Sequence, residues 1–245
     1  MVFAPAWGPP GTQERKRMHI LSLVTQKGGS GKSTIASSLA IAAHQAGERV
    51  FIIDMDPQAS LLRWYKTRRN KKDIAVEAVT PGKLPSAVKA LEKSGVTLVI
   101  IDTPGTESPT TTAAMKVSDL CIIPSRPNVF DLWASENTRK TIRSLRKEYA
   151  FLLNQCPPAQ QSARVEQGSQ ALQAMGALLT PLISARVDHQ EASRQGLGVT
   201  EAAPHGEAAG EMTALWRSIK RRMNKGKTKP APARGSAAKT LRKAA

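Results

Sequence analysis

A glycine-rich segment between an apolar run and a run with helical spacing is the feature that most restricts how this 245-residue chain can fold. The apolar run spans residues 20–24, and the helical run spans residues 35–45. The segment between them contains Lys27, Gly28, Gly29, Ser30, Gly31, Lys32, Ser33 and Thr34. A loop at such a junction directs several backbone N–H groups into one concavity, where the helix dipole adds positive potential. The sequence therefore predicts a phosphate-binding loop, and an incidental glycine-rich hairpin is the alternative.

Two side chains of this loop have the chemistry that a nucleotide needs. Lys32 can reach the β- and γ-phosphates, and the Ser33 hydroxyl can bind Mg²⁺. The usual pattern is G-x-x-x-x-G-K-[ST], but Gln26 occupies its first glycine position and Lys27 opens the loop. The loop resembles the deviant Walker A motif, K-G-G-x-G-K-[ST], of the ParA/MinD family of ATPases. The resemblance implies ATP and Mg²⁺ as cofactors and residues 27–34 as nucleotide-binding residues.

The resemblance also gives Lys27 a role beyond its own subunit. In the ParA/MinD family the lysine at this position reaches across a dimer to the partner's ATP. The resemblance therefore implies a homodimer when ATP is bound, with Lys27 and Lys32 both contributing to catalysis. A local structural role is the alternative for Lys27.

Short apolar runs alternate with segments of helical spacing along the chain, which predicts an α/β fold: a doubly wound, mostly parallel sheet with helices on both faces. In such a sheet the ligand binds at the carboxyl ends of the strands. The expected domain spans residues 18–224, between a disordered leader at 1–17 and a disordered basic tail at 225–245. The predicted strands are 20–24, 50–53, 75–78, 98–101, 120–123, 151–153 and 178–179, and the predicted helices are 33–45, 58–69, 85–93, 110–116, 131–148, 163–175 and 206–223.

Acidic residues follow two of the predicted strands. A carboxylate at a strand end beside a bound triphosphate can orient water for in-line attack. The segment 54–58, with the sequence DMDPQ, resembles the D-x-D-P-Q box of ParA-type proteins, and the resemblance implies that Asp56 polarises the attacking water while Asp54 supports the Mg²⁺ shell. An ordinary acidic turn is the alternative. The apolar run 98–101 ends in Asp102, a Walker B pattern that places Asp102 near Mg²⁺ opposite Ser33.

Two further residues are candidates at this edge of the sheet. Gly105 can let the backbone turn away below the γ-phosphate. Asn154 follows the strand 151–153, and an amide there can pair with the adenine edge. In relatives an Asn at this place contacts the base, whereas a strand-terminal Asn in a turn is the alternative.

The charge of the chain predicts a polyanionic partner. Lys and Arg number 36 against 19 Asp and Glu, a net charge of +17, and no acidic residue follows Glu211. Nucleic acid is favoured over anionic lipid, and a solvated tail is the alternative. Because no base-reading motif is present, the expected DNA binding is nonspecific. Basic clusters lie at 63–72, on the helix 131–148 and from residue 217 onward, and the DNA-binding candidates are Arg139, Arg143, Arg146, Lys147, Arg186, Arg194, Arg217, Lys220, Arg221 and Arg222.

These features predict a ParA-like ATPase for plasmid or chromosome partitioning, similar to the small ParA/ParF-type proteins. The expected ATP-bound dimer binds nonspecific DNA and is released when a ParB/ParG-like, cargo-bound activator protein stimulates an otherwise slow hydrolysis. No membrane partner is expected, and the expected location is the bacterial cytoplasm, on the nucleoid. The alternatives are a MinD/McdA-like positioning ATPase for a protein or membrane cargo, a metabolic relative, which the presence of only Cys121 and Cys156 disfavours, and a DNA-binding module without enzymatic activity.

Overall fold

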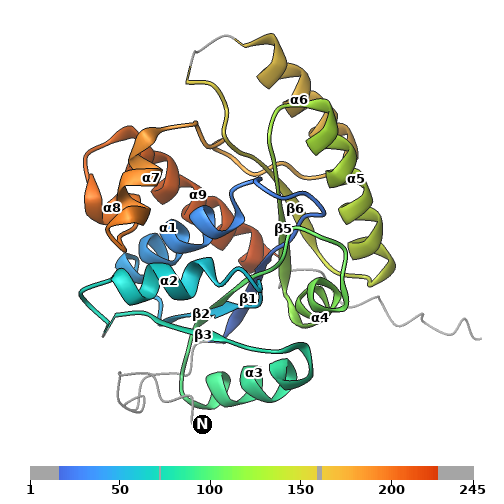
Figure 1. The fold of residues 1–245 in the computed structure, drawn as a ribbon. Coiled ribbons are helices and arrows are strands. Elements are labelled where there is room, and N and C mark those ends of the chain that lie inside the picture. The colour runs from blue at the N-terminus through green and yellow to red at the C-terminus, as the bar shows by residue number, and fades with distance from the viewer. Residues whose placement is uncertain (1–16, 72, 159–161, 226–245) are drawn as a thin grey trace, which may run out of the picture.

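A six-stranded parallel sheet forms the centre of the molecule (Figure 1). The computed structural model describes residues 17–71, 73–158 and 162–225. The strand order is β3-β2-β4-β1-β5-β6, so the first strand, which leads into the glycine-rich loop, lies between two neighbours. The predicted parallel α/β fold is confirmed. The strands are β1 (His19–Leu23), β2 (Val50–Asp54), β3 (Ala75–Ala78), β4 (Leu98–Asp102), β5 (Leu120–Ser125) and β6 (Tyr149–Leu153).

Helices cover both faces of the sheet (Figure 1). Figure 1 shows α1, α2, α7, α8 and α9 on one side and α3, α4, α5 and α6 on the other. This arrangement buries both faces of the central strands, which explains why their sequences are nearly continuous apolar runs. The helices are α1 (Lys32–Gln45), α2 (Ser60–Thr67), α3 (Leu84–Lys93), α4 (Pro109–Val117), α5 (Val129–Ser144), α6 (Ala163–Met175), α7 (Val187–Arg194), α8 (Val199–Ala202) and α9 (Glu207–Lys225), and the 3-10 turn η1 (Pro81–Lys83) precedes α3.

The alternation of side chains along each strand divides the core into layers. Val50 and Ile52 of β2 pack with α1, α2 and α9. Phe51 and Ile53, the intervening residues, pack with α3 and α4 on the opposite face. A third cluster lies between β5, β6, α5 and α6. The sheet is therefore held from both sides, and its carboxyl edge is fixed as a rigid platform.

Several predicted boundaries are wrong, and the backbone explains them. The helix predicted over 131–148 ends at Ser144, because Arg146 adopts a left-handed conformation with φ 55° and the chain turns back into β6. The helix predicted from residue 58 begins at Ser60, since Ala59 has φ 52°. The strand predicted at 178–179 is a single bridge between Phe151 and Leu178. Helices α7 and α8 lie outside the helices predicted from the sequence.

The termini were also part of the prediction. The expected leader, apart from Arg17, and the expected tail beyond residue 225 lie outside the described residues. Within the described part of the chain, every helix is too short or too polar to span a lipid bilayer.

Candidate nucleotide-binding site

The glycine-rich loop connects the end of β1 to the start of α1, as predicted. Gly29 and Gly31 have φ values of 74° and 88°, a left-handed conformation that favours glycine. A Cβ at position 31 would also lie 2.4 Å from Nδ2 of Asn154. The sequence can form this loop only because glycine occupies these positions. Lys27, at the start of the loop, is partly exposed.

Ser33 and Asp102 meet at the base of the loop. The parallel register places Asp102 beside Leu23 of β1 and beside Asp54 of β2. Oγ of Ser33 donates a hydrogen bond of 2.5 Å to Oδ2 of Asp102. Asp102 is fully buried, and this burial raises its pKa to about 7, although Ser33 and Lys32 oppose the shift. Burial lowers the pKa of Lys32, which Asp102 and Asp56 partly counteract.

The Ser33–Asp102 pair fits a magnesium ion. Oδ1 of Asp102 is buried and has no hydrogen-bond partner within the described residues. A hydroxyl and a carboxylate are oxygen ligands, which Mg²⁺ prefers, and Mg²⁺ at a phosphate site usually takes its remaining ligands from phosphate and water. The described residues hold no cluster of three His, Cys, Asp or Glu side chains that could bind a metal without a nucleotide. A site made of one hydroxyl and one carboxylate therefore needs further ligands from phosphate and water.

Asp54 holds the turn between β2 and α2. Its Oδ1 accepts a hydrogen bond from the backbone N–H of Asp56 at 3.1 Å, and its Oδ2 accepts from Leu61 and Leu62 at 3.1 Å each. Burial raises the pKa of Asp54, while these three N–H groups lower it. The carboxylate therefore caps the first turn of α2, which sequence reasoning missed. Its support of the Mg²⁺ shell stays a prediction.

Asp56 and Gly105 both lie close to the glycine-rich loop. Asp56 is partly exposed, and its Oδ1 accepts from the backbone N–H of Gln58 at 2.9 Å. Its charge acts on Lys32, which places the carboxylate near the phosphate-binding lysine. A Cβ at position 105 would lie 2.9 Å from both Cα and N of Gly28, so only glycine allows this close approach. The segment after β4 thus abuts the phosphate-binding loop.

Asn154 contacts the loop backbone. Its Nδ2 donates to the carbonyl oxygen of Ser30 at 2.8 Å, and Nε2 of Gln155 donates to Gly29 at 3.1 Å. A cavity of about 350 Å³ opens beside Gly31 and Asn154 and is also lined by residues 184–190. Base recognition by Asn154 stays a prediction.

Two residues around this loop were not predicted. His189 lines the cavity, is 7% exposed, and has no hydrogen-bond partner for either ring nitrogen within the described residues. Burial lowers its pKa, and Glu211 opposes this shift. Arg126 lies at the loop's other side, where its Nη1 is 3.9 Å from the position of a Cβ on Gly29, and Asp131 holds it through hydrogen bonds of 2.9 and 3.1 Å. A single histidine and a single arginine give no sequence signal.

The predicted DNA-binding residues fall into two groups. Arg143, Arg146, Arg217 and Arg221 are exposed and form no ion pair with the described residues. The others contact the protein itself. Three donate hydrogen bonds to backbone carbonyls: Arg139 to Met175, Lys147 to Ser118 and Arg222 to Tyr149. Three form ion pairs: Arg186 with Glu207 and Glu211, Arg194 with Glu191, and Lys220 with Glu48. These contacts reduce the charge that the second group offers to a polyanion.

The fold and the loop define a P-loop nucleotide-binding protein, and comparison with known proteins identifies its family. Residues 21–199 match the model of the CobQ/CobB/MinD/ParA nucleotide binding domain, and the chain belongs to this family of nucleotide-binding ATPases. The predicted relation to ParA and MinD is therefore confirmed.

Individual relatives cover different shares of the chain. Maintenance of carboxysome distribution protein A from Halothiobacillus neapolitanus is 28% identical over 199 residues, which cover 78% of this chain and 91% of that protein. Protein ParA from Rhizobium radiobacter is 32% identical over 115 residues, or 46% of this chain and 51% of that protein. The septum site-determining protein MinD from Pyrococcus horikoshii, solved with Mg-ADP, has a TM-score of 0.69 at 18% identity, covering 84% of this chain and 97% of that chain. The last comparison concerns the fold alone.

Proposed function

We propose that this chain is a ParA-like partition ATPase: ATP binding forms a homodimer, the dimer binds nonspecific DNA, and a cargo-bound activator of the ParB/ParG kind stimulates hydrolysis and release. The observation that carries the proposal is the pair formed by Ser33 and buried Asp102 beneath Lys32, with the partly exposed Asp56 on the adjoining strand end. In this proposal the protein acts in the bacterial cytoplasm, on the nucleoid, without a membrane partner.

The roles of the residues follow from where they lie. Lys32 binds the β- and γ-phosphates, and its low exposure strengthens that attraction. Ser33 and Asp102 hold Mg²⁺, which when bound neutralises charge on the phosphate oxygens. Asp56 orients the attacking water by accepting its hydrogen bond. Lys27 completes the site of the second subunit, so hydrolysis needs the dimer.

The proposal includes slow basal hydrolysis, and the contacts of Arg126 support it. Arg126 is the basic side chain beside Gly29, and its bidentate contact with Asp131 holds it in place. An arginine held this way is not free to act on a transferring phosphoryl group. An activator that supplies or releases a cation would therefore raise the rate.

Nucleotide-dependent binding to a random-sequence DNA duplex tests this function. The full chain is titrated with ATP, ADP or no nucleotide across a salt series, and its mass is followed by light scattering. We expect a dimer and tight, salt-sensitive binding with ATP, and neither with Lys32→Gln. Binding that is equal in all nucleotide states would refute the partition function.

A second candidate function is positioning of a protein cargo. The similarity to the carboxysome distribution protein over 78% of this chain favours it. In that function the ATP-dependent dimer is the same, but the activator protein is bound to a protein assembly instead of to a plasmid or chromosome. Equal DNA binding in all nucleotide states, together with an ATP-dependent dimer, would favour this candidate.

A further inference from the structure

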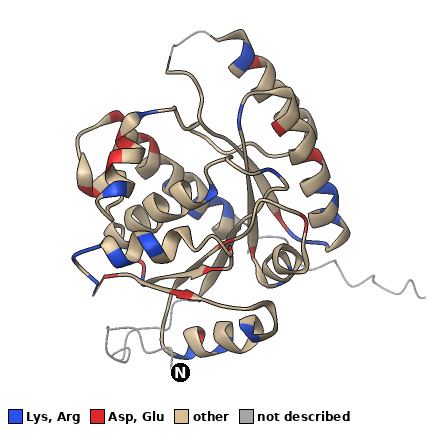
Figure 2. Ribbon diagram, viewed as in Figure 1, with Lys and Arg blue, Asp and Glu red and all other residues tan. Residues whose placement is uncertain are grey.

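Helix α2 and the loop after it present a group of basic side chains that have no acidic partner in the described part of the chain. Arg63, Lys66 and Arg69 are exposed and form no ion pair within the described residues, and Nζ of Lys71 lies 5.7 Å from the ring centroid of Tyr65. The chain contains no Asp or Glu between residues 60 and 71. Figure 2 shows basic positions in blue along α2 and the loop that follows it. We call Arg63, Lys66, Arg69 and Lys71 the α2 surface.

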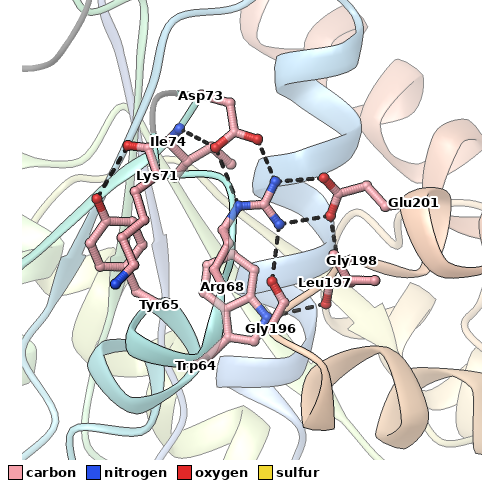
Figure 3. A network of polar contacts seen from close by, with 10 residues as sticks. All are labelled: Trp64, Tyr65, Arg68, Lys71, Asp73, Ile74, Gly196, Leu197, Gly198 and Glu201. Carbon is pink, nitrogen blue, oxygen red and sulfur yellow. Dashed lines mark hydrogen bonds and ion pairs between the residues drawn. The ribbon is translucent and has the colours of Figure 1, made fainter.

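Another cation of this segment, Arg68, is buried and forms ion pairs inside the protein. The cluster 63–72 was predicted to face a polyanion as a whole, but the Arg68 side chain is 1% exposed. Its Nη1 donates to Oε2 of Glu201 at 2.8 Å, its Nε donates to Oδ1 of Asp73 at 3.2 Å, and the three side chains form the network in Figure 3. Arg68 therefore pairs with both Asp73 and Glu201 and neutralises one of these two negative charges, which reduces how far they offset the α2 surface.

The same network fixes the geometry of the α2 surface. Nη1 of Arg68 donates to the carbonyl of Gly196 at 3.0 Å, and Nε1 of Trp64 donates to Leu197 at 3.1 Å (Figure 3). Gly196 has φ 70°, and a Cβ there would lie 2.5 Å from the backbone N of Arg68. The end of α2 is thus packed directly against the α7–α8 turn. The cations around it project from a rigid support.

The α2 surface borders a groove. A cavity of about 530 Å³ is lined by Thr67, Arg69 and Asn70 at the end of α2 and after it, by Gln195 and Leu197 after α7, and by the Arg68–Glu201 pair. Arg194, on the last turn of α7, is exposed and pairs only with the exposed Glu191 on its own helix. A surface ion pair of this kind contributes only about 0–1 kcal/mol, so it reduces the charge that Arg194 offers to a phosphate only in part.

Helix α2 also connects this surface to the nucleotide site. Asp54 at the end of β2 accepts the N–H groups of Leu61 and Leu62 in the first turn of α2. Asp56 lies in the loop between them. A change at this loop would therefore move the helix that bears the cations.

We propose that the α2 surface binds the phosphate backbone of duplex DNA. The inference rests on the proposed function, and it assigns the DNA contact to α2 in addition to the residues on α5 and α9. Phosphate fits the surface because its cations have no acidic partner among the described residues and the helix end beside them is anchored through Trp64 and Arg68. A membrane fits less well, since insertion requires exposed apolar anchors. The large exposed apolar residues of the described chain are Val129, Phe130, Trp133 and Val187, none of which lies on α2.

A matched pair of triple variants of the full chain tests the proposal. The first carries Arg63→Gln, Lys66→Gln and Arg69→Gln. The control carries Lys83→Gln, Lys89→Gln and Lys93→Gln, which remove the same charge from exposed positions at and before α3, on the opposite face of the sheet. Binding to a random-sequence 60-base-pair duplex is measured with ATP between low and physiological salt. ATP binding and circular dichroism report whether each variant is intact.

We expect the α2 variant to bind DNA about tenfold or more weakly and to lower the slope of log affinity against log salt by about 2.7, since each phosphate contact contributes about 0.9. The α3 control should stay within a factor of about two of the wild type, because it loses no phosphate contact. Equal losses in the two variants, or no loss in either, would overturn the assignment to α2 while leaving ATP-dependent DNA binding in place. No binding by the wild type in any nucleotide state would instead refute the proposed function. Binding to vesicles that contain anionic lipid is measured in parallel. If the α2 variant loses binding to these vesicles while its DNA binding is unchanged, the α2 surface binds a membrane and the proposal is wrong.

Discussion

The carboxylate of Asp54 should stabilise the fold even when neither nucleotide nor Mg²⁺ is present. It is 2% exposed and accepts backbone N–H groups from Asp56, Leu61 and Leu62 at 3.1 Å each. The change Asp54→Ala leaves all three donors without this acceptor. A buried donor that loses its partner costs about 1–3 kcal/mol. Water can reach the N–H of Asp56 in its partly exposed loop, so the two donors in α2 dominate.

We therefore expect Asp54→Ala to lower the free energy of unfolding by about 3–5 kcal/mol. Asp54→Asn keeps one oxygen acceptor and should cost less, about 1–2 kcal/mol, and it remains measurable if the alanine variant does not fold. The matched control is Asp56→Ala, which loses one hydrogen bond, from Gln58, in an exposed loop. Surface changes of this kind usually stay within about 0.5 kcal/mol.

Urea unfolding followed by circular dichroism, in EDTA and without nucleotide, measures these differences, and ATP hydrolysis is measured in parallel. The two variants should separate: Asp54→Ala loses stability in EDTA, whereas Asp56→Ala keeps its stability and loses hydrolysis. If Asp54→Ala unfolds like the wild type in EDTA, Asp54 is not the cap of α2, and a role confined to the Mg²⁺ shell explains it better. If Asp56→Ala hydrolyses ATP at the wild-type rate, the assignment of the water-orienting carboxylate is wrong.

Two further predictions concern the loop and the cavity beside it. Gly105→Ala should slow hydrolysis by about 10- to 100-fold and also lower the melting temperature, because its Cβ would lie 2.9 Å from the backbone of Gly28 and displace the loop. Gly82→Ala, whose Cβ meets no atom within 4 Å, is the control, and equal rates in both variants would contradict the argument. His189→Gln should flatten the dependence of melting temperature on pH. Burial lowers the pKa of His189 below its value in the unfolded chain, so the folded state favours the neutral imidazole. The wild type therefore has its full stability above about pH 6.5 and loses part of it as the pH falls through the folded pKa. The control is His205→Gln, at an exposed position, which should leave the pH dependence of the melting temperature as in the wild type.

Much of the fold and the core of the site followed from the sequence, because both depend on residues that are close together in the chain. The glycine-rich loop needs contiguous residues with left-handed backbone at Gly29 and Gly31, and its position between a strand and a helix is visible in the sequence. Parallel strands end at one edge of a sheet, so Asp102 could be placed near Ser33 before the structure was known, and the structure joins them at 2.5 Å. Helix ends were less accurate, since single residues such as Ala59 and Arg146 turn the backbone without a glycine.

The tertiary structure alone decided which charges are free. Arg63 and Arg68 belong to one basic cluster in the sequence, yet Arg63 is exposed whereas Arg68 is buried against Glu201, which is 133 residues away. The same holds for Arg186, whose charge is taken by Glu207 and Glu211. Net charge and spacing record how many cations a segment has, but a buried charge needs a partner, and that partner is chosen by packing between distant elements. The sequence therefore determined that this protein can bind a nucleotide, and the folded structure determined which surfaces can bind anything else.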